Sequence, residues 1–474
     1  MVEPPAPAAD GTKLTTRVRV GYGVGDLGAS LTFVALNTWL LYYLVNIAHL
    51  SPLTAGVVFL LGRAFDAALD PLMGVLSDRL RWTVGRIPFV RWGAPWLGLV
   101  FAALWALPGL RPDHAFALAL ALSLLFSLAY TVVQVPYMAL TPELAPDYDE
   151  RTTLSSYRVA FGTMASMLAV AAPPIIVLSF SHDAVLARSA PLGWAAMGVL
   201  FGLLTVVAYL IVASAVPEPR RPPPTQAPAS GLDDVRQALR INGYPELLAL
   251  FVAITVGIMI VNSMLPFYLE SALRIPGPQQ TPVLGLLFGA AVASFPLWNA
   301  LSARIGKRLA LTAGLVLLSA GLAALTLAAP AGHVGAILLA LTALSGVGLS
   351  AVMLLPWAML PDVVEFDELA TGQRREGVVV ALFTFSQKLA GSLGVFANAI
   401  AATLFGYVAG AAGQAPGTVL GLRLMTGPAA VAVFIVAIVL TLRFPITRAS
   451  HRAARDALEA RRRGGAADRP RPSS

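Results

Sequence analysis

The sequence contains no cysteine, and charged residues are scarce. Without cysteine, the chain can form no disulfide, no thiolate metal site and no cysteine nucleophile. Asp, Glu, Lys and Arg together make up 12% of the 474 residues, whereas 57% are hydrophobic and the mean hydropathy is +0.74. A soluble globular domain carries about 25% charged residues. The composition therefore excludes an ordinary soluble protein and indicates an integral membrane protein.

Hydrophobic runs fill most of the chain. Runs of about 20 residues or more recur, and each is long enough to cross a hydrocarbon core of roughly 30 Å as an α-helix. A β-barrel would alternate apolar and polar residues instead. Charged residues, Gly and Pro divide the sequence into twelve expected spans: 18–47, 53–79, 87–109, 114–142, 151–180, 189–215, 243–272, 279–301, 307–329, 332–361, 374–407 and 417–446.

A proline-dense, charged break separates the first six spans from the last six. It divides the chain into an N-terminal arm (1–17), a first bundle (18–215), a linker (216–242), a second bundle (243–446) and a basic tail (447–474). The arm precedes an apolar run that is too long for a signal peptide. With both termini inside, roughly two dozen Lys and Arg fall on the cytoplasmic side and about three outside, as the positive-inside rule requires. We expect a multi-pass protein of the cell membrane with both termini cytoplasmic, and the loop-bound basic residues give no reason to expect nucleic-acid binding.

The two halves repeat one another in their loops. VPYMALTPELAPDYDERTTLSSYR after the fourth span and LPWAMLPDVVEFDELATGQRREG after the tenth share the order proline, aromatic, proline, acid, acidic loop, arginine. DRLRWTVGR after the second span has a shorter counterpart, ARIGKR, after the eighth. Matched motifs six spans apart predict an all-α membrane protein of twelve transmembrane helices in two parallel six-helix bundles, the architecture of the major facilitator superfamily, with a solute site between the halves.

Three ionisable residues interrupt the second span. Arg63, Asp66 and Asp70 are spaced so that a helix places them in one polar stripe over about two turns. An ionised side chain at the bilayer centre costs at least about 2.5 kcal/mol, so two carboxylates need compensating charge or an aqueous cavity. A static ion pair that holds helices together is one explanation. We favour a cation site, because Arg63 neutralises only one acid and a bound Na+ or H+ would cancel the other.

Other polar residues lie at similar depth, namely Asn37, Thr131, Gln134, Arg158 and Lys388. Lys388 lies about four helical turns from the cytoplasmic end of its span, too deep to reach water easily. A buried ammonium group needs a carboxylate, and Asp66 and Asp70 are the main deep ones available. We hypothesise that Lys388 pairs with these acids when the cation is absent and leaves them when it binds.

At these positions the sequence resembles the glycoside-pentoside-hexuronide:cation symporters, the group that contains the bacterial melibiose carrier. The resemblance runs from about Gly21 to Tyr407 and is carried by YGVGDLG, RAFDAALDPLMGVLSDR, YTVVQVPYMALTPEL, the YR at 157–158 and QKLAGSLG. It implies a major facilitator fold and symport of a solute with Na+, Li+ or H+. It also implies that the cation binds to Asp66, Asp70 and Thr131. It aligns Arg158 with the melibiose carrier's span-five arginine, which contacts sugar, and Lys388 with its span-eleven lysine.

The sequence departs from the family where sugar is bound. Ser30 and Gln134 occupy positions where the carrier has aspartates, and Met138 and Met353 stand where it has tryptophans. Carboxylates and aromatic rings are what sugar recognition usually needs. The resemblance therefore implies either a different glycoside or a more apolar solute such as a lysolipid.

Several charged residues are candidates for gating. GVLSDRLRWTVGR resembles the superfamily's loop motif, in which a glycine, here Gly74, lets helices approach and charges latch the inward gate; the charges here are Asp78, Arg79 and Arg86. Asp26 is expected in a structural or gating ion pair rather than in solute contact. A further set is expected either in salt bridges that close the cytoplasmic side or as solvated loop charges: Glu143, Arg151, Asp362 and Arg375.

The leading hypothesis is a monomeric secondary active symporter that carries a sugar or glycoside-type solute by alternating access, with Na+ favoured over H+ because two acids and Thr131 suit Na+. Its other contacts are membrane lipids, and no cofactor is expected beyond the coupling ion. The alternatives are transport of an amphiphile and a non-transporting membrane sensor. An enzyme is disfavoured, because no His, Ser or carboxylate constellation suggests hydrolysis and the five histidines are scattered.

Overall fold

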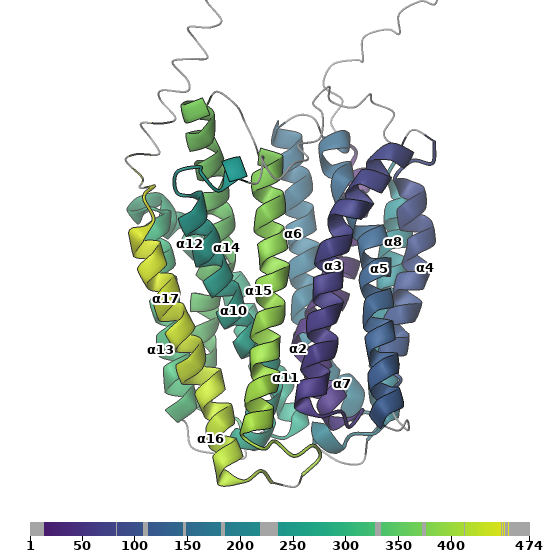
Figure 1. Cartoon of the computed structure of the whole chain (residues 1–474), viewed down its shortest axis with the longest axis vertical. Coiled ribbons are helices and arrows are strands. Elements are labelled where there is room, and N and C mark those ends of the chain that lie inside the picture. The colour runs from purple at the N-terminus through teal and green to yellow at the C-terminus, as the bar shows by residue number, and fades with distance from the viewer. Residues whose placement is uncertain are drawn as a thin grey trace, which may run out of the picture.

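The protein is a bundle of long helices that run between two faces (Figure 1). The computed structural model describes residues 14–81, 83–107, 112–145, 148–181, 185–218, 236–327, 333–371, 376–411 and 413–446, with residues 448, 450 and 454. Within these residues the regular structure is entirely helical. We call the face where the first helix begins and the last one ends the terminal face, and the other the distal face (Figure 1).

The first bundle follows the expected order of spans. Its helices are α1 (Thr16–Gly23), α2 (Gly25–Asn46), α3 (Pro52–Leu80), α4 (Ile87–Leu104), α5 (Pro112–Leu144), α6 (Tyr148–Ala171), α7 (Pro173–Leu178), the short η1 (Leu186–Arg188) and α8 (Pro191–Ala215). α1 and α2 together form the first span. α2 packs against α6 and α8, α3 against α5, and α4 against α5 and α8.

The second bundle repeats this plan. It contains α10 (Tyr244–Phe267), the π-turn η2 (Tyr268–Ala272), α11 (Gly277–Ala293), α12 (Phe295–Ile305), α13 (Lys307–Leu327), α14 (Ala336–Thr371), α15 (Glu376–Leu404), α16 (Pro416–Leu424), the π-turn η3 (Met425–Ala429) and α17 (Ala430–Arg443). α10 packs against α15 and α17, α11 against α14, and α13 against α14 and α17. Each bundle thus contributes six spans.

Ten of the described helices are long and apolar enough to cross a membrane, and α11 with α12 makes an eleventh span bent by 41°. The remaining expected span, α6 with α7, is interrupted at Pro173 and Pro174, whose missing N–H groups break the helical hydrogen bonding. Its first turns also carry Glu150 and Arg151, which lower its hydropathy. The all-helical, multi-pass fold predicted from the sequence is confirmed.

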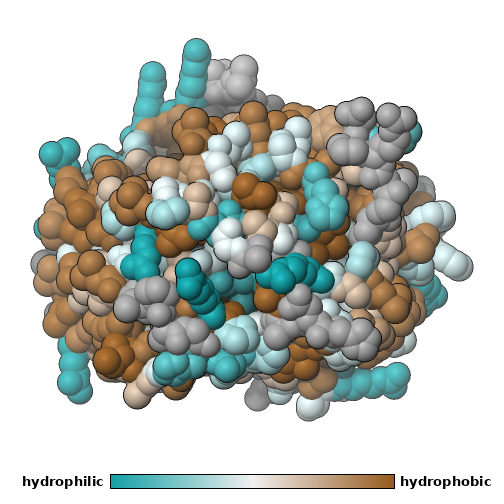
Figure 2. All heavy atoms as spheres, turned by 90° about the horizontal axis from the view of Figure 1, so that it is seen from below, coloured by the Kyte–Doolittle hydropathy of each residue, from teal (hydrophilic) through white to brown (hydrophobic). Residues whose placement is uncertain are grey.

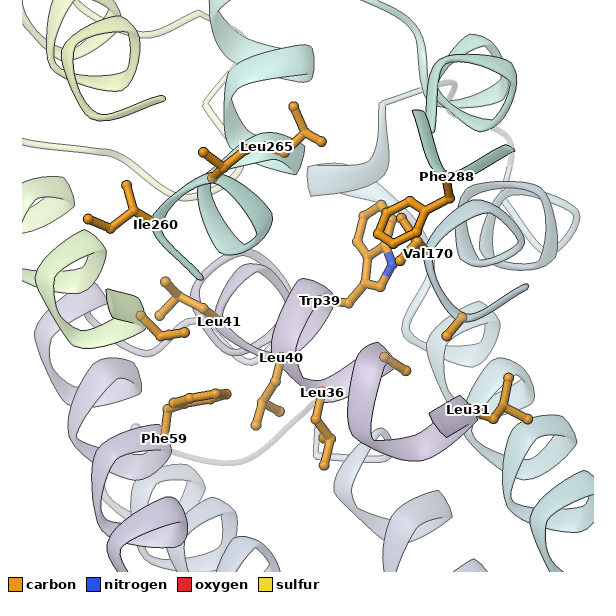
Figure 3. Close-up of a cluster of buried hydrophobic side chains, with 14 of the residues drawn as sticks. Leu31, Leu36, Trp39, Leu40, Leu41, Phe59, Val170, Ile260, Leu265 and Phe288 are labelled. Atoms are coloured by element: carbon orange, nitrogen blue, oxygen red, sulfur yellow. The ribbon is translucent and has the colours of Figure 1, made fainter. Parts of the chain in front are cut away.

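The two bundles meet along α2, α3, α6 and α7 from the first half and α10, α11 and α15 from the second. Near the distal face α3 and α15 pack so closely that a methyl group added at Gly56 would overlap Ala399. Figure 3 shows Trp39 of α2 beside Val170 of α6 and Phe288 of α11. Toward the terminal face the ribbons of α3 and α15 diverge (Figure 1), and a side chain at Gly74 would meet nothing within 4 Å.

Some predicted segments lie outside the described residues. These are residues 1–13 of the N-terminal arm, 219–235 of the linker, and nearly all of the basic tail. The domain boundaries assigned from the sequence therefore stay predictions.

A backbone turn at the terminal face joins α4 to the end of the first bundle. Gly85 has φ of +86°, which favours glycine. This turn lets the Glu218 carboxylate accept hydrogen bonds from the backbone N–H groups of Arg86 (2.6 Å) and Ile87 (2.9 Å) at the start of α4. Glu218 thus caps α4 and ties it to the segment that follows α8.

Replacing Gly85 by alanine should destabilise the protein. A left-handed backbone costs a non-glycine residue about 1–2 kcal/mol, and the added Cβ would lie 2.7 Å from the carboxyl carbon of Glu218. We expect the Gly85→Ala protein to melt several degrees below wild type in detergent. Gly74→Ala is the matched control, because that site is helical and open; equal melting temperatures for both variants would contradict the role of the turn.

Candidate functional site

The acidic stripe of α3 faces α5 inside the first bundle. The Thr131 hydroxyl lies 3.0 Å from Asp66 Oδ1 and 3.3 Å from Asp70 Oδ1. Because a hydroxyl has one hydrogen, it can donate to only one carboxylate at a time. The three oxygen-bearing side chains expected to hold a cation therefore converge on one point.

Lys388 of α15 reaches across from the second bundle to both acids. Its Nζ lies 2.5 Å from Asp70 Oδ2 and 2.9 Å from Asp66 Oδ2. Lys388 belongs to one bundle and the carboxylates to the other, so these ion pairs also hold the two halves together. The pairing expected from the cost of burying an ammonium group in a membrane is present.

Arg63 lies on the other side of Asp66. Its guanidinium is 3.8 Å from Asp66 Oδ2, donates to Asn37 Oδ1 at 3.2 Å, and stands over the Phe33 ring at 4.2 Å. It is 6% exposed. Asn37 and the aromatic face therefore hold this arginine in place beside the carboxylates, and Asn37 serves the cluster through Arg63.

Formal charge at the cluster sums to zero, with Asp66 and Asp70 balanced by Arg63 and Lys388. The two acids differ in burial, since the Asp66 side chain is 1% exposed and that of Asp70 is 35% exposed. Asp66 Oδ2 accepts no hydrogen bond, although it contacts Lys388 as an ion pair. A carboxylate oxygen has two lone pairs, so Oδ2 has capacity for a further ligand beside the lysine. Among the described residues no group of three or more His, Asp or Glu side chains gathers to hold a metal ion.

Arg158 of α6 forms a second polar cluster with α2. Its Nε lies 2.5 Å from Asp26 Oδ2, and its Nη2 lies 2.7 Å from the Met138 sulfur on α5. Its guanidinium also stands 5.6 Å from the ring centre of Tyr137. The ion pair expected for Asp26 is thus formed with Arg158, the residue that the family resemblance assigns to the solute.

The other predicted solute positions are spread over three helices. Gln134 accepts from Tyr209 at 2.7 Å, and Ser30 of α2 lies beside Gly162 of α6. Met138 is 42% exposed and shares a helix face with Thr131 and Gln134. Met353 of α14 is 43% exposed.

The Met353 side of α14 points toward the other helices of its bundle. Trp357, one turn further on, packs its ring 5.1 Å from Phe383 of α15 and 5.7 Å from Phe251 of α10. Residues four apart share a helix face, so Met353 lies on the same face of α14 as Trp357, the face directed at α10 and α15.

The chain matches a known protein family over almost its whole length. The profile of a family described as "MFS/sugar transport protein" matches residues 21–448. The chain belongs to this MFS sugar-transport family. Its members are transporters rather than enzymes, and the glycoside–cation-symporter resemblance seen in the motifs is confirmed.

Relatives of this MFS transporter are named as symporters. The chain is 28% identical to a Synechocystis protein described as an uncharacterized symporter, over 95% of this chain and 97% of that one. It is 27% identical to a putative glycoside/cation symporter of Escherichia coli, over 84% of each chain. It is 24% identical to the mouse sodium-dependent lysophosphatidylcholine symporter 1, over 93% of this chain and 88% of the other.

A solved structure also matches the fold. A bacterial homologue of the human lysosomal transporter Spinster, in an inward-facing conformation, superposes with a TM-score of 0.67 at 14% identity, covering 92% of this chain and 97% of that one. At this identity the match concerns the major facilitator fold alone.

Charged residues of the transporter's terminal face are paired within each bundle. Arg86 is 4% exposed and contacts Asp78 at 2.7 Å and Glu143 at 3.0 Å. Asp362 contacts Lys307 at 2.6 Å in the second bundle.

The remaining gating candidates differ in their surroundings. Arg151 is exposed and donates to the Ala145 carbonyl at 3.3 Å, while Arg79 is exposed at the end of α3. Arg375 lies outside the described residues. Salt bridges that close the terminal face across the two bundles stay a prediction.

Sequence reasoning missed the contacts that join the bundles at the distal face. Tyr42 of α2 donates to Glu270 of η2, and Tyr407 donates to Asn46 Oδ1 at 3.0 Å. The Phe267 ring lies between the two tyrosines, 5.0 Å from Tyr42 and 5.1 Å from Tyr407. We call these five residues the distal lock. Glu270 was visible as an acid near the end of an expected span, but its partner is 228 residues away.

The distal face as a whole is mixed in character. Hydrophilic side chains gather across its middle, and hydrophobic ones dominate its left and right sides (Figure 2). This arrangement suits a surface whose centre meets water and whose rim meets lipid.

Weakening the distal lock should let the halves separate at this face. Asn46→Ala removes the acceptor for Tyr407 and for the Gly410 N–H. Because the chain has no cysteine, introducing Ser51→Cys and Gly413→Cys gives a protein that is spin-labelled at these two positions and nowhere else. We expect the label-to-label distance distribution measured by electron paramagnetic resonance to gain a longer component in Asn46→Ala.

The matched control is Gln414→Ala, because Gln414 bonds only to Val408 within one loop. A distribution that is the same in Asn46→Ala, Gln414→Ala and the labelled parent would show that this contact does not hold the bundles together.

Proposed function

We propose that the chain is a cation-coupled secondary active symporter in which Lys388 and the coupling cation compete for Asp66 and Asp70. The observation that carries the proposal is the bridge from Lys388 to both acids, across the boundary between the bundles. A monovalent cation at the acids would supply the same positive charge that Lys388 supplies in its absence. Cation binding and release of the inter-bundle ion pair are then one event.

Charge explains why the exchange couples to movement. Ions in the membrane interior need compensating charge. Both acids can therefore stay ionised at a low free-energy cost only while two positive charges face them. When a cation replaces Lys388, the lysine must find a new partner or water, so the link between α3 and α15 is broken. A solute that binds better to the rearranged halves would favour cation binding to the same extent, because coupling is reciprocal.

Na+ fits this site better than H+ as the coupling ion. Two carboxylates and the Thr131 hydroxyl offer hard oxygen ligands, which hard cations prefer. Asp66 Oδ2 faces the Lys388 ammonium at 2.9 Å and accepts no hydrogen bond from another described residue, so a cation that displaced the lysine would find this oxygen available. Sodium dependence in the name of the mouse lysophosphatidylcholine symporter supports this choice.

The state described corresponds to closure on one side. The distal lock and the close packing at Gly56 seal the bundles at the distal face, whereas α3 and α15 diverge at the terminal face. With both termini in the cytoplasm, as the distribution of basic residues predicts, this is the inward-facing conformation of an alternating-access cycle. The proposed location is the cell membrane.

The solute proposed first is a sugar or glycoside. The polar groups of the Arg158–Asp26 cluster, with Gln134 nearby in sequence on the Thr131 face of α5, can bind hydroxyl groups. The family description and the Escherichia coli relative point the same way.

A lysolipid-like amphiphile is the second candidate. Met138 and Met353 present exposed apolar side chains from α5 and α14, where the family resemblance places tryptophans. Flexible methionine side chains accommodate varied apolar groups better than they stack on sugar rings. Uptake of labelled glycosides and lysolipids into vesicles under a Na+ gradient separates the two; uptake of neither would leave a membrane sensor as the better description.

Neutralising either acid should abolish cation coupling without unfolding the protein. Asp66→Asn or Asp70→Asn removes a charge that the cation is proposed to balance, so Na+ should no longer raise the melting temperature of the purified protein. The control is Glu246→Gln at the start of α10, outside the cluster. Full Na+ stabilisation in both asparagine variants would contradict the cation site.

Removing the lysine should strengthen cation binding while uncoupling it. In Lys388→Gln the cation no longer competes with an ammonium group, so we expect Na+ to bind about tenfold more tightly by isothermal titration. Lys388→Arg keeps the charge and should bind Na+ as weakly as wild type. If the glutamine variant bound Na+ less tightly than wild type, competition between lysine and cation would be ruled out.

A further inference from the structure

A cavity lies in the second bundle, at the terminal face. It measures about 510 Å³, within the roughly 300–1,000 Å³ typical of small-molecule sites. Its wall comes from the end of α12, the start of α13, α14, and the segment after α17. None of these elements carries a residue of the Asp66–Asp70 cluster, so the cavity is separate from the proposed cation site.

Two arginines in this wall have no acidic partner within the part of the chain that the structure describes. Arg308 donates to the Phe444 carbonyl at 3.2 Å, and Arg448 donates to the Arg304 carbonyl at 2.6 Å. Neither guanidinium forms an ion pair with a carboxylate of the described residues, whereas Lys307 in the same wall is neutralised by Asp362. Each guanidinium has five N–H donors, so both keep donors to spare.

The backbone carbonyls hold these guanidinium groups without neutralising them. Two positive charges on one cavity are favourable only if an anion or water faces them. Guanidinium groups match phosphate oxygens in a forked geometry, which makes arginine the usual residue for phosphate recognition.

One edge of the cavity continues into an apolar surface. Ile305 and Leu309 line the cavity and are 42% and 51% exposed. Val316, seven residues after Leu309, lies on the same face of α13 and is 52% exposed. An acyl chain that starts at the cavity can therefore follow this strip along α13 into the membrane.

The identity of the anion follows from where the cavity lies. It is at the end of the membrane-spanning helices, at the depth where phospholipid headgroups lie. The chain that follows is itself strongly basic, with seven arginines against three acids in residues 451–474, so its composition favours a separate anion at this cavity. Basic pockets between helices at this level are suited to anionic headgroups.

We propose that this cavity binds the phosphate of an anionic phospholipid, with Arg308 and Arg448 on the headgroup and Ile305 and Leu309 against the first part of the acyl chains. The lipid links α13 to the segment after α17 and so stabilises the second bundle. Free phosphate offers the same headgroup chemistry without the acyl chains, and the experiment distinguishes the two.

The test is native mass spectrometry and thermal melting of the full-length purified protein with four additions: phosphatidylglycerol, phosphatidylcholine, glycerol 3-phosphate and inorganic phosphate. Phosphatidylglycerol should stay bound and raise the melting temperature, and phosphatidylcholine should not. In the double variant Arg308→Gln/Arg448→Gln, phosphatidylglycerol should bind on the order of 30-fold more weakly, from about 1 kcal/mol for each basic residue.

Arg443→Gln is the matched control, because Arg443 is exposed at the end of α17 but does not line the cavity. It should bind phosphatidylglycerol as wild type does. Monodispersity on size-exclusion chromatography without added lipid shows whether the double variant is folded. If the double variant is not folded, Arg308→Lys/Arg448→Lys, which keeps the charges, is tested in its place. This lysine variant should bind phosphatidylglycerol more weakly than wild type. The proposal is overturned if wild type does not distinguish the two lipids, if the folded variant binds phosphatidylglycerol as wild type does, or if glycerol 3-phosphate or inorganic phosphate stabilises the protein as much as the lipid.

Discussion

A set of ion pairs between two helix bundles is the interaction on which the rest of this transporter depends. Lys388 contributes the positive charge from α15, and Asp66 and Asp70 contribute the negative charges from α3. In water such contacts would be weak, but inside a membrane ionised carboxylates need compensating charge, which Lys388 and Arg63 supply here. In the proposed cycle these ion pairs join the two halves until the coupling cation takes the place of the lysine.

The surrounding structure directs this exchange. Arg63 is held beside Asp66 by Asn37 and two phenylalanine rings, which is why Lys388 is the charge proposed to move. The distal lock closes one end of the boundary between the bundles, while contacts of Glu218 and Arg86 join α3, α4 and the segment after α8 at the other end of the first bundle. The proposed movement therefore falls at the boundary between the bundles, as rocking of one bundle against the other requires.

Particular residues show how far sequence reasoning reached. The Lys388 pairing was predictable, because a deep lysine must find a carboxylate and only two deep ones were at hand. The pairing of Arg158 with Asp26 was only half predictable: each was singled out, but the resemblance assigned Arg158 to the solute. The distal lock was not predictable, because Tyr42, Asn46 and Glu270 follow no local pattern that connects them. The break at Pro173 within the expected span 151–180 was also not predicted, because it depends on where packing requires the helix to bend.

The sequence by itself determined that this chain crosses the membrane many times as helices in two related halves, and which few charged residues lie deep within it. The physical reason is that hydrophobic length and the cost of burying charge act on each span locally, so both can be read without knowing its neighbours. Only the tertiary structure decided which charges meet, which face is closed, and that Arg308 and Arg448 share one cavity. Those outcomes depend on how helices far apart in sequence pack together, and no single span contains that information.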